Sequence, residues 1–427
     1  MAQKLKNRRE VYLKGYEESQ CFLLRLGGMY VKNDKYKWLN KIYVTFYLGT
    51  FVMLIVFIGP YNFYVSIPIG ETFTFFIVLH FWIVMIGYTG TSVMYHINGD
   101  SIDRALYMIG EGFYTYQGSK EEPEAKLIVE KNKKFLEKLT NFMIPNAIFV
   151  GLFVTCATPI VELVNLGGAI PEGSVLNPYL PLPIFWTWDQ FTIHGYILSY
   201  LAVVLATIFI VLQLLALSLG YSSFMVSYIT QFELLNLSIR NMESRATHYY
   251  LNLNPPIPRR GMSKFSDPLF QAAMRHCLKQ NIQHHQALLR WMKEAQNFLG
   301  WALLTTFLAT SILLATTGYL FLEANDSIFK LLTLIEVQVL ELVHSYLFCW
   351  WGENLATESS KIPTSLYGVP WYQCDLKFRK MFHIMLSNCL DPLIPRDKVL
   401  KLKASLETYG SMISTSYTYF NVIRSAN

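Results

Sequence analysis

The chain has 427 residues, of which 52% are apolar and only 15% are charged, and its formal net charge is +6. Soluble domains carry about 25% charged residues and disordered chains are poor in apolar residues, so this composition excludes both classes. The positive charge does not indicate nucleic-acid binding, because the basic residues alternate between segments of the chain and form no single patch.

Six apolar runs are long enough to cross a bilayer as helices, which takes about 20 residues. They lie at 39–59, 73–94, 142–163, 196–220, 298–322 and 327–351. A seventh stretch, 404–423, has no Lys or Arg and one acidic residue, but it holds seven Ser or Thr residues. We therefore predict an all-α membrane protein with seven transmembrane helices.

The distribution of Lys and Arg predicts the orientation, because these residues accumulate on the cytoplasmic side of membrane spans. With seven spans, alternate segments hold 34 and 2 of the 36 basic residues. The basic segments are a cytoplasmic N-terminus (1–38), loops 95–139 and 221–297, and segment 352–403. The C-terminus is then extracellular, the reverse of G-protein-coupled receptors. The sequon at 325–327 falls in an outer loop.

Ionisable residues inside spans are costly and often functional. Here they are His80, Glu336, Glu341 and His344, a set that a proton-coupled transporter would use. Glu341 and His344 are three residues apart on one helix, so they can also pair with each other. We find no motif of an enzyme, a metal site or a cofactor site, and we expect none of these.

The seventh stretch carries a polar stripe. Steps of four and three residues place its members on one face of a helix: Ser411, Thr415, Thr418, Val422 and Ser425. Several such helices around an axis would enclose a pore, and a ring of apolar side chains would gate it by dewetting. The alternative is a helix that packs against its neighbours through small residues.

The C-terminal third resembles the insect odorant receptors. The resemblance rests on YLFCWWGENL at 346–355, Glu358-Ser359, Trp371-Tyr372 and STSYTYFNVIRS at 414–425. It implies an odorant-gated, non-selective cation channel in the plasma membrane of olfactory neurons, built as a hetero-tetramer with the co-receptor Orco. Segment 352–403 would be a cytoplasmic anchor with a helix at 371–394, and residues 404–427 would form the pore-lining helix and a short tail, with Val422 at the gate.

The resemblance also implies an odorant pocket in the outer half, among the second, third, fourth and sixth spans. The residues that these spans offer are Phe73, Phe76, His80, Phe81, Phe149, Phe153, Tyr196, Tyr200, Val204, Leu334, Val337 and Gln338. Such a cavity is apolar and aromatic with few polar groups, which suits a small neutral volatile. A metabotropic seven-helix chemoreceptor is the main alternative function, and a transporter is a further one.

Overall fold

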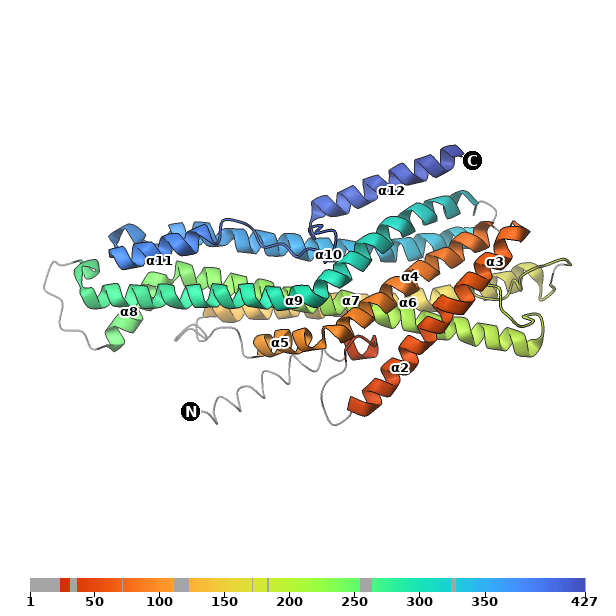
Figure 1. Ribbon diagram of the computed structural model, residues 1–427, viewed down its shortest axis with the longest axis horizontal. Helices are drawn as coiled ribbons and strands as arrows, with labels where there is room; N and C mark the ends of the chain where they lie inside the picture. The colour runs from red at the N-terminus through yellow and green to blue at the C-terminus, as the bar shows by residue number, and fades with distance from the viewer. Residues whose placement is uncertain are drawn as a thin grey trace.

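The computed structural model describes residues 24–30, 37–70, 72–110, 123–170, 172–182, 184–253, 263–323 and 328–426. Most of the predicted N-terminal segment and the sequon at 325–327 lie outside this part. The described chain is helical, with no strand beyond one bridge between Arg396 and Lys403. The helices form an elongated bundle (Figure 1).

The first span is longer than the sequence predicted. It consists of α2 (Lys37–Met53), the π-helical turn η1 (Leu54–Ile58) and α3 (Gly59–Ile69), so it continues past the predicted end at 59. Pro60 lies in the first turn of α3, where a missing N–H is tolerated. The π turn just before it absorbs the lost helical hydrogen bond, as such bulges do.

The remaining long helices are α4 (Thr72–Ile97), α6 (Pro123–Leu166), α7 (Ile193–Arg240), α9 (Pro268–Glu323), α10 (Ile328–Tyr367) and α12 (Leu406–Ala426). Five stretches of the described chain are long and apolar enough to cross a membrane: Lys41–Ile69, Thr74–Ile97, Pro123–Leu166, Ile193–Arg240 and Pro268–Phe321. With the more polar α10 and α12 the fold has seven membrane helices.

Four helices, α6, α7, α9 and α10, are much longer than a bilayer is thick. At 1.5 Å per residue the 48 residues of α7 span about 72 Å and the 56 residues of α9 about 84 Å, against a hydrocarbon core of about 30 Å. The stretches between predicted spans are therefore largely helical extensions. They form a second bundle with α5 (Gly99–Gly110), α8 (Met242–Asn252) and α11 (Leu376–Ser387).

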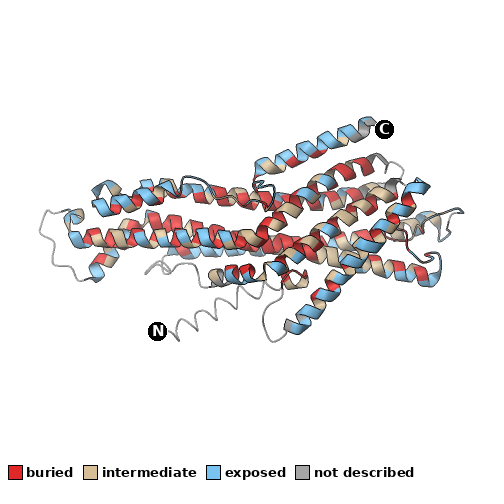
Figure 2. Ribbon diagram, in the orientation of Figure 1, coloured by how far each residue is buried: buried red, intermediate tan, exposed pale blue. Residues whose placement is uncertain are grey.

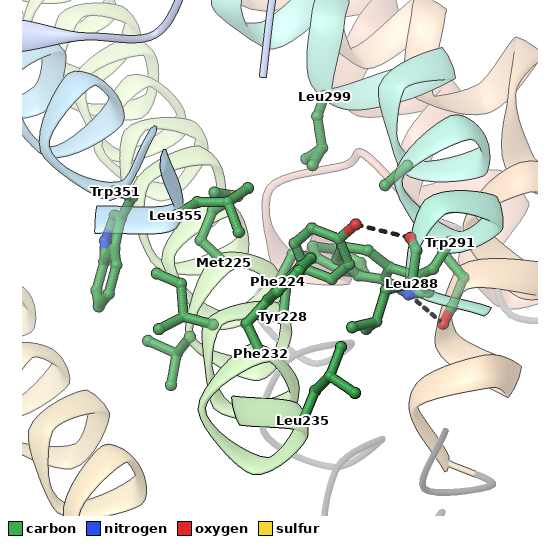
Figure 3. Close-up of a cluster of buried hydrophobic side chains, with 14 of the residues drawn as sticks. Phe224, Met225, Tyr228, Phe232, Leu235, Leu288, Trp291, Leu299, Trp351 and Leu355 are labelled. Atoms are coloured by element: carbon green, nitrogen blue, oxygen red, sulfur yellow. Dashed lines mark hydrogen bonds between the residues drawn. The ribbon is translucent and has the colours of Figure 1, made fainter. Parts of the chain in front are cut away.

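Aromatic side chains fill the core of this second bundle (Figure 3). Trp291 of α9 stacks on Tyr228 of α7 with ring centroids 4.4 Å apart, and both are fully buried. The Tyr228 hydroxyl donates to the Leu288 carbonyl at 2.7 Å, and Trp291 Nε1 donates to the Ala105 carbonyl at 3.0 Å. Both polar groups are satisfied, so the aromatic pair joins α5, α7 and α9 without a buried polar cost.

Burial is uneven across the fold. The inner parts of α7 and α9 are mostly buried, whereas α12 packs on α9 and α10 along one face and is otherwise mostly exposed (Figure 2). α2 also exposes large apolar side chains, among them Trp38, Ile42 and Phe46. Exposed apolar surface of this extent is expected where lipid, rather than water, surrounds a helix.

Candidate functional site

An apolar cluster fills the outer half of the membrane bundle. Its buried members come from α4, α6, α7 and the loop before α7: Ile77, Val78, Val150, Val154, Leu180, Leu182, Trp186 and Val203. Four of the predicted pocket residues pack against it, namely Phe81, Tyr196, Tyr200 and Val337. The structure thus brings side chains of the second, fourth and sixth membrane helices together around one apolar core.

The loop before α7 covers this cluster and is fixed by Asn62 of α3. The buried Asn62 side chain donates to the Phe185 carbonyl at 2.9 Å and accepts from the Phe185 N–H at 2.7 Å. Trp188 extends the lid, because it stacks on Trp186 and its Nε1 donates to Ser199 at 3.0 Å. These contacts hold an apolar loop over the outer end of the cluster.

A second group of predicted residues faces α9 instead. Phe76 packs on Tyr319 with ring centroids 4.3 Å apart and joins Leu334 in a small separate cluster. The buried His80 lies beside Thr317, with Nδ1 3.4 Å from the threonine oxygen. The predicted pocket residues of α4 therefore divide between an α7-facing and an α9-facing group.

The other predicted pocket residues have varied surroundings. Phe149 is 61% exposed on α6, whereas Phe153 and Val204 are half-buried. The side chain of Phe73 lies outside the described part of the chain. Gln338 is buried, and neither its Nε2 nor its Oε1 has a hydrogen-bond partner among the described residues.

Buried amides nearly always have partners, so the Gln338 side chain is available to bond a polar group of a ligand. The tyrosine hydroxyls are not available in the same way. Tyr200 donates to the Thr155 carbonyl at 3.2 Å and Tyr196 to the Tyr179 carbonyl at 3.3 Å. These hydroxyls tie α7 to α6 and to the covering loop.

A cavity of about 60 Å³ adjoins the α7-facing group. It is lined by the first span, α4, the covering loop and α7. Of the predicted pocket residues, Phe81 is among those that line it. Leu54, Trp82, Leu182 and Trp186 line it too, although the sequence did not single them out. The sequence does contain a signal for the contribution of the loop, because the apolar run LPLPIFW at 180–186 is unusual for an outer loop. Ligand pockets usually measure 300–1,000 Å³, so a ligand must displace side chains here.

His344 does not pair with Glu341, contrary to the expectation that the two might satisfy each other. Its Nδ1 lies 2.6 Å from the Ser218 hydroxyl and its Nε2 lies 3.3 Å from that of Thr306. Both ring nitrogens are thus engaged by hydroxyls of α7 and α9. These two contacts give the buried histidine a structural role that joins α10 to α7 and α9.

The two faces of α12 differ sharply. Met412 and Ser416 are buried, and the Ser416 hydroxyl donates to the Ser311 carbonyl of α9 at 3.1 Å. Phe420, one turn further, lies against Gly318. The predicted polar stripe is exposed throughout: Ser411, Thr415, Thr418, Val422 and Ser425. At 100° per residue the stripe is nearly opposite the packed face, so α12 turns it away from its own bundle.

Three hydroxyls of the stripe bond within their own helix. Ser411 donates to the Glu407 carbonyl at 2.9 Å, Thr418 to the Ser414 carbonyl at 3.0 Å and Ser425 to the Val422 carbonyl at 2.9 Å. Their protons are therefore satisfied without a partner helix. What they present outwards is hydroxyl oxygen, an acceptor that suits water and hydrated cations.

The segment before α12 is docked firmly onto α9 and α10. The buried Asp397 carboxylate accepts the N–H groups of Val399, Leu400 and Leu402, at 2.8, 2.6 and 2.5 Å. The Lys398 N–H bonds the Gly300 carbonyl of α9 at 3.0 Å. The base of α12 is thus held on the bundle, and Ser416 and Phe420 continue the contact with α9 further along the helix.

The cytoplasmic histidines and cysteines form no metal centre in the described chain, since no group of three potential ligands converges. Cys389 Sγ lies 3.6 Å from His285 Nε2. Burial raises the pKa of the Cys389 thiol to about 12 and lowers the pKa of His284 to about 3. Both groups are therefore neutral at physiological pH, as packed core residues are.

The sequence is similar to a known receptor family over most of its length. The family profile described as 7tm Odorant receptor matches residues 72–417. Among individual relatives, Odorant receptor 19a of Drosophila melanogaster is 25% identical over 159 residues, which are 37% of this chain and 41% of that protein. Odorant receptor 47a of the same species is 21% identical over 294 residues, or 64% and 67%. The first-named match thus spans less than half of the relative.

The fold is similar to that of a solved olfactory receptor. The structure of the insect olfactory receptor OR5 from Machilis hrabei in complex with eugenol matches with a TM-score of 0.75 and 13% identity, over 98% of this chain and 99% of that one. A second structure of the same receptor matches with the same TM-score of 0.75, at 12% identity. At such identity the likeness concerns the fold.

Proposed function

The chain belongs to the 7tm odorant receptor family and is a multi-pass membrane protein, and from this we propose that it is the odorant-recognising subunit of a ligand-gated, non-selective cation channel. In this proposal it assembles with the co-receptor Orco into a hetero-tetramer in the plasma membrane of olfactory neurons. Each subunit contributes α12 to a shared central pore. The N-terminus is cytoplasmic and the C-terminus extracellular.

The observation that carries the proposal is the orientation of α12. It packs on its own chain through Met412, Ser416 and Phe420, while its hydroxyl stripe is exposed. A polar stripe within a membrane needs water or protein on that side. A water-filled axis between subunits meets this need, and Val422, 59% exposed within the stripe, supplies the apolar ring of a dewetting gate.

We place the odorant in the outer half, at the apolar cluster to which α4, α7 and α10 contribute. Apolar burial supplies most of the affinity, and Gln338 supplies one polar contact through its unpaired amide. A small, neutral and partly polar volatile fits this chemistry. Eugenol, which is bound in the similar OR5 structure, has that character.

A short chain of contacts links this region to the gate. His80 and Phe76 contact Thr317 and Tyr319 of α9, and Gly318 between them packs against Phe420 of α12. Phe420 is two residues from Val422. An odorant that favours a different packing at this point of α9 would bias the position of α12, so the open population would rise.

The test is to record currents from cells that express the chain with Orco, with Orco alone, and with the chain alone, against a panel of volatiles. We expect a cation current only in the first case for at least one volatile. The response must persist in excised patches without nucleotide, because a metabotropic receptor would lose it there. Flux that saturates with substrate and vanishes when Glu336 and Glu341 are both changed to Gln would instead indicate a transporter.

A further inference from the structure

A groove at the cytoplasmic end of α6, α7 and α10 has no part in odorant binding or in the pore. Its volume is about 490 Å³, within the range of small-molecule sites. Lys131, Lys134 and Lys138 line it from α6, at steps of three and four residues that place them on one helix face. Three cations thus edge a concave site of ligand size.

The acidic residues of the groove already have partners. Glu233 of α7 accepts a hydrogen bond from the Asn132 amide at 2.5 Å and forms an ion pair with Lys131 at 3.6 Å. Glu358 of α10 forms an ion pair with Lys361 at 2.5 Å. Lys134 forms an ion pair with Glu130, but both side chains are exposed, and such surface pairs contribute little free energy. Among the described residues no carboxylate pairs with Lys138, so positive charge remains available at the upper end of the groove.

Aromatic side chains form the wall next to these lysines. Phe135 lies between them on α6 and is 40% exposed. Its ring centroid is 5.5 Å from that of Trp350 and 5.6 Å from that of Trp351. Trp351 is buried and donates to Ser222 at 2.9 Å, which holds the wall in place. Cations beside amphipathic rings are typical of the membrane–water boundary.

The depth of these lysines relative to the bilayer also places the groove at the membrane–water boundary. The third span is predicted to begin at 142, so Lys138 lies four residues, or about 6 Å, on its cytoplasmic side. That is headgroup depth, and Lys131 reaches about two turns further into the cytosol. The cytoplasmic leaflet carries the anionic lipids.

We propose that this groove binds the headgroup of an anionic phospholipid of the inner leaflet. The phosphates lie against Lys134 and Lys138, and the acyl chains leave past Trp350 towards the bilayer. The proposal rests on the fold and its orientation and does not depend on the odorant response. A lipid bound here would join the cytoplasmic part of α6 to α10, the helix that also contacts α12.

The full-length protein, purified with its partner subunits, can be tested by native mass spectrometry with a soluble dioctanoyl phosphatidylinositol 4,5-bisphosphate. We expect it to bind this lipid at least tenfold more tightly than dioctanoyl phosphatidylcholine. Changing both Lys134→Gln and Lys138→Gln should weaken binding about 25-fold, fivefold for each lysine, as the loss of one basic residue at an anionic surface predicts. Lys138→Arg should preserve binding, because it keeps the charge.

The matched control is the pair Lys126→Gln and Lys133→Gln, which removes the same charge from the same helix outside the groove. We expect less than a twofold change for it. An equal loss in the control, or equal binding of phosphatidylcholine, would overturn the site. Equally tight binding of inositol trisphosphate without acyl chains, or displacement of the lipid by an acidic peptide at lower concentration, would overturn the lipid as its occupant.

Discussion

Two glycines mark places where helices or loops approach so closely that no side chain fits. A Cβ placed on Gly352 of α10 would lie 1.9 Å from the carbonyl oxygen of Ala404, just before α12 begins. A Cβ on Gly318 of α9 would lie 2.7 Å from the ring of Phe420. The first contact is with backbone and cannot yield without moving the chain, whereas the second is with a side chain that can turn.

Gly352→Ala is therefore expected to destabilise the protein by about 3 kcal/mol, the upper part of the range for overpacked positions. The cause is displacement of the docked segment around Ala404 from α10. Thermal denaturation of the detergent-solubilised protein, followed by fluorescence-detected gel filtration, measures the effect. Gly410→Ala is the control, since nothing lies within 4 Å of a Cβ there. Equal melting of the two variants would contradict the close approach.

The buried His284 makes the cytoplasmic bundle sensitive to acid. Burial, then His285 and Arg245, lower its pKa from 6.5 to about 3, so the folded state stays unprotonated while the unfolded chain takes up a proton below pH 6.5. Stability should be constant above pH 6.5 and fall on acidification, by about 1.4 kcal/mol between pH 7.5 and 5.5. Melting measured at both values checks this.

His284→Gln should weaken that dependence, because it removes the most strongly shifted histidine of the bundle; burial also lowers the pKa of His285, so part of the dependence remains. His248→Gln serves as the matched control, since His248 is exposed on α8. A pH dependence that persists unchanged in His284→Gln would show that other groups cause it. The glutamine retains hydrogen-bonding capacity, so the variant remains measurable at neutral pH.

For single residues, the sequence predicted which side chains lie in the outer half better than it predicted the contacts that they make there. It predicted Phe81, Tyr200 and Val337 for the outer half, and these do pack together. It could not predict that the Tyr200 hydroxyl bonds a backbone carbonyl while the Gln338 amide has no partner. Such differences arise from the relative rotation of helices distant in sequence, which periodicity within one helix does not encode.

The helices themselves follow more directly from the sequence, and α12 is the clearest case. Its start at Leu406 is close to the predicted 404, and Ser405 accepts the Thr408 N–H at 3.2 Å as an N-cap. The first span was less predictable. The pair Gly59-Pro60 suggested an end, yet a π turn accommodates the proline and the helix continues to Ile69. Gly59 and Pro60 do not end the helix there, because a chain inside a membrane must complete its backbone hydrogen bonds.

The two faces of α12 give a direct test of the pore. In the complex with Orco, Thr418→Cys and Val422→Cys should react with a charged, membrane-impermeant thiol reagent applied from outside, and the odorant-evoked current should fall by more than half. Ser416→Cys should not react, because that position is 3% exposed and faces α9. The unsubstituted chain controls for native cysteines. Reaction at 416 with none at 418 or 422 would place the pore elsewhere.

Across the whole molecule, the outer half of the membrane bundle and the cytoplasmic bundle are packed differently. The inner lengths of α7, α9 and α10 share one large aromatic core with α11, which suits a rigid anchor for assembly. The outer half holds smaller separate clusters and a cavity. Smaller clusters rearrange at lower cost than one continuous core, so the part of the molecule that must respond to a ligand is also its less tightly packed part.

The link between these parts runs through α9, and Gly318→Ala tests it. The added methyl group would turn the Phe420 ring out of its contact with Gly318, so odorant binding would bias the gate less. We expect the odorant concentration for half-maximal current to rise between about two- and thirtyfold, the range for residues that modulate coupling, with surface expression unchanged. Gly90→Ala on α4, where a Cβ meets nothing within 4 Å, controls for replacing a glycine in a membrane helix. If the two variants respond alike, the contact between Gly318 and Phe420 does not transmit the signal. The route to α12 would then be α10, because the Tyr409 hydroxyl of α12 donates to the Leu342 carbonyl of α10 at 3.4 Å.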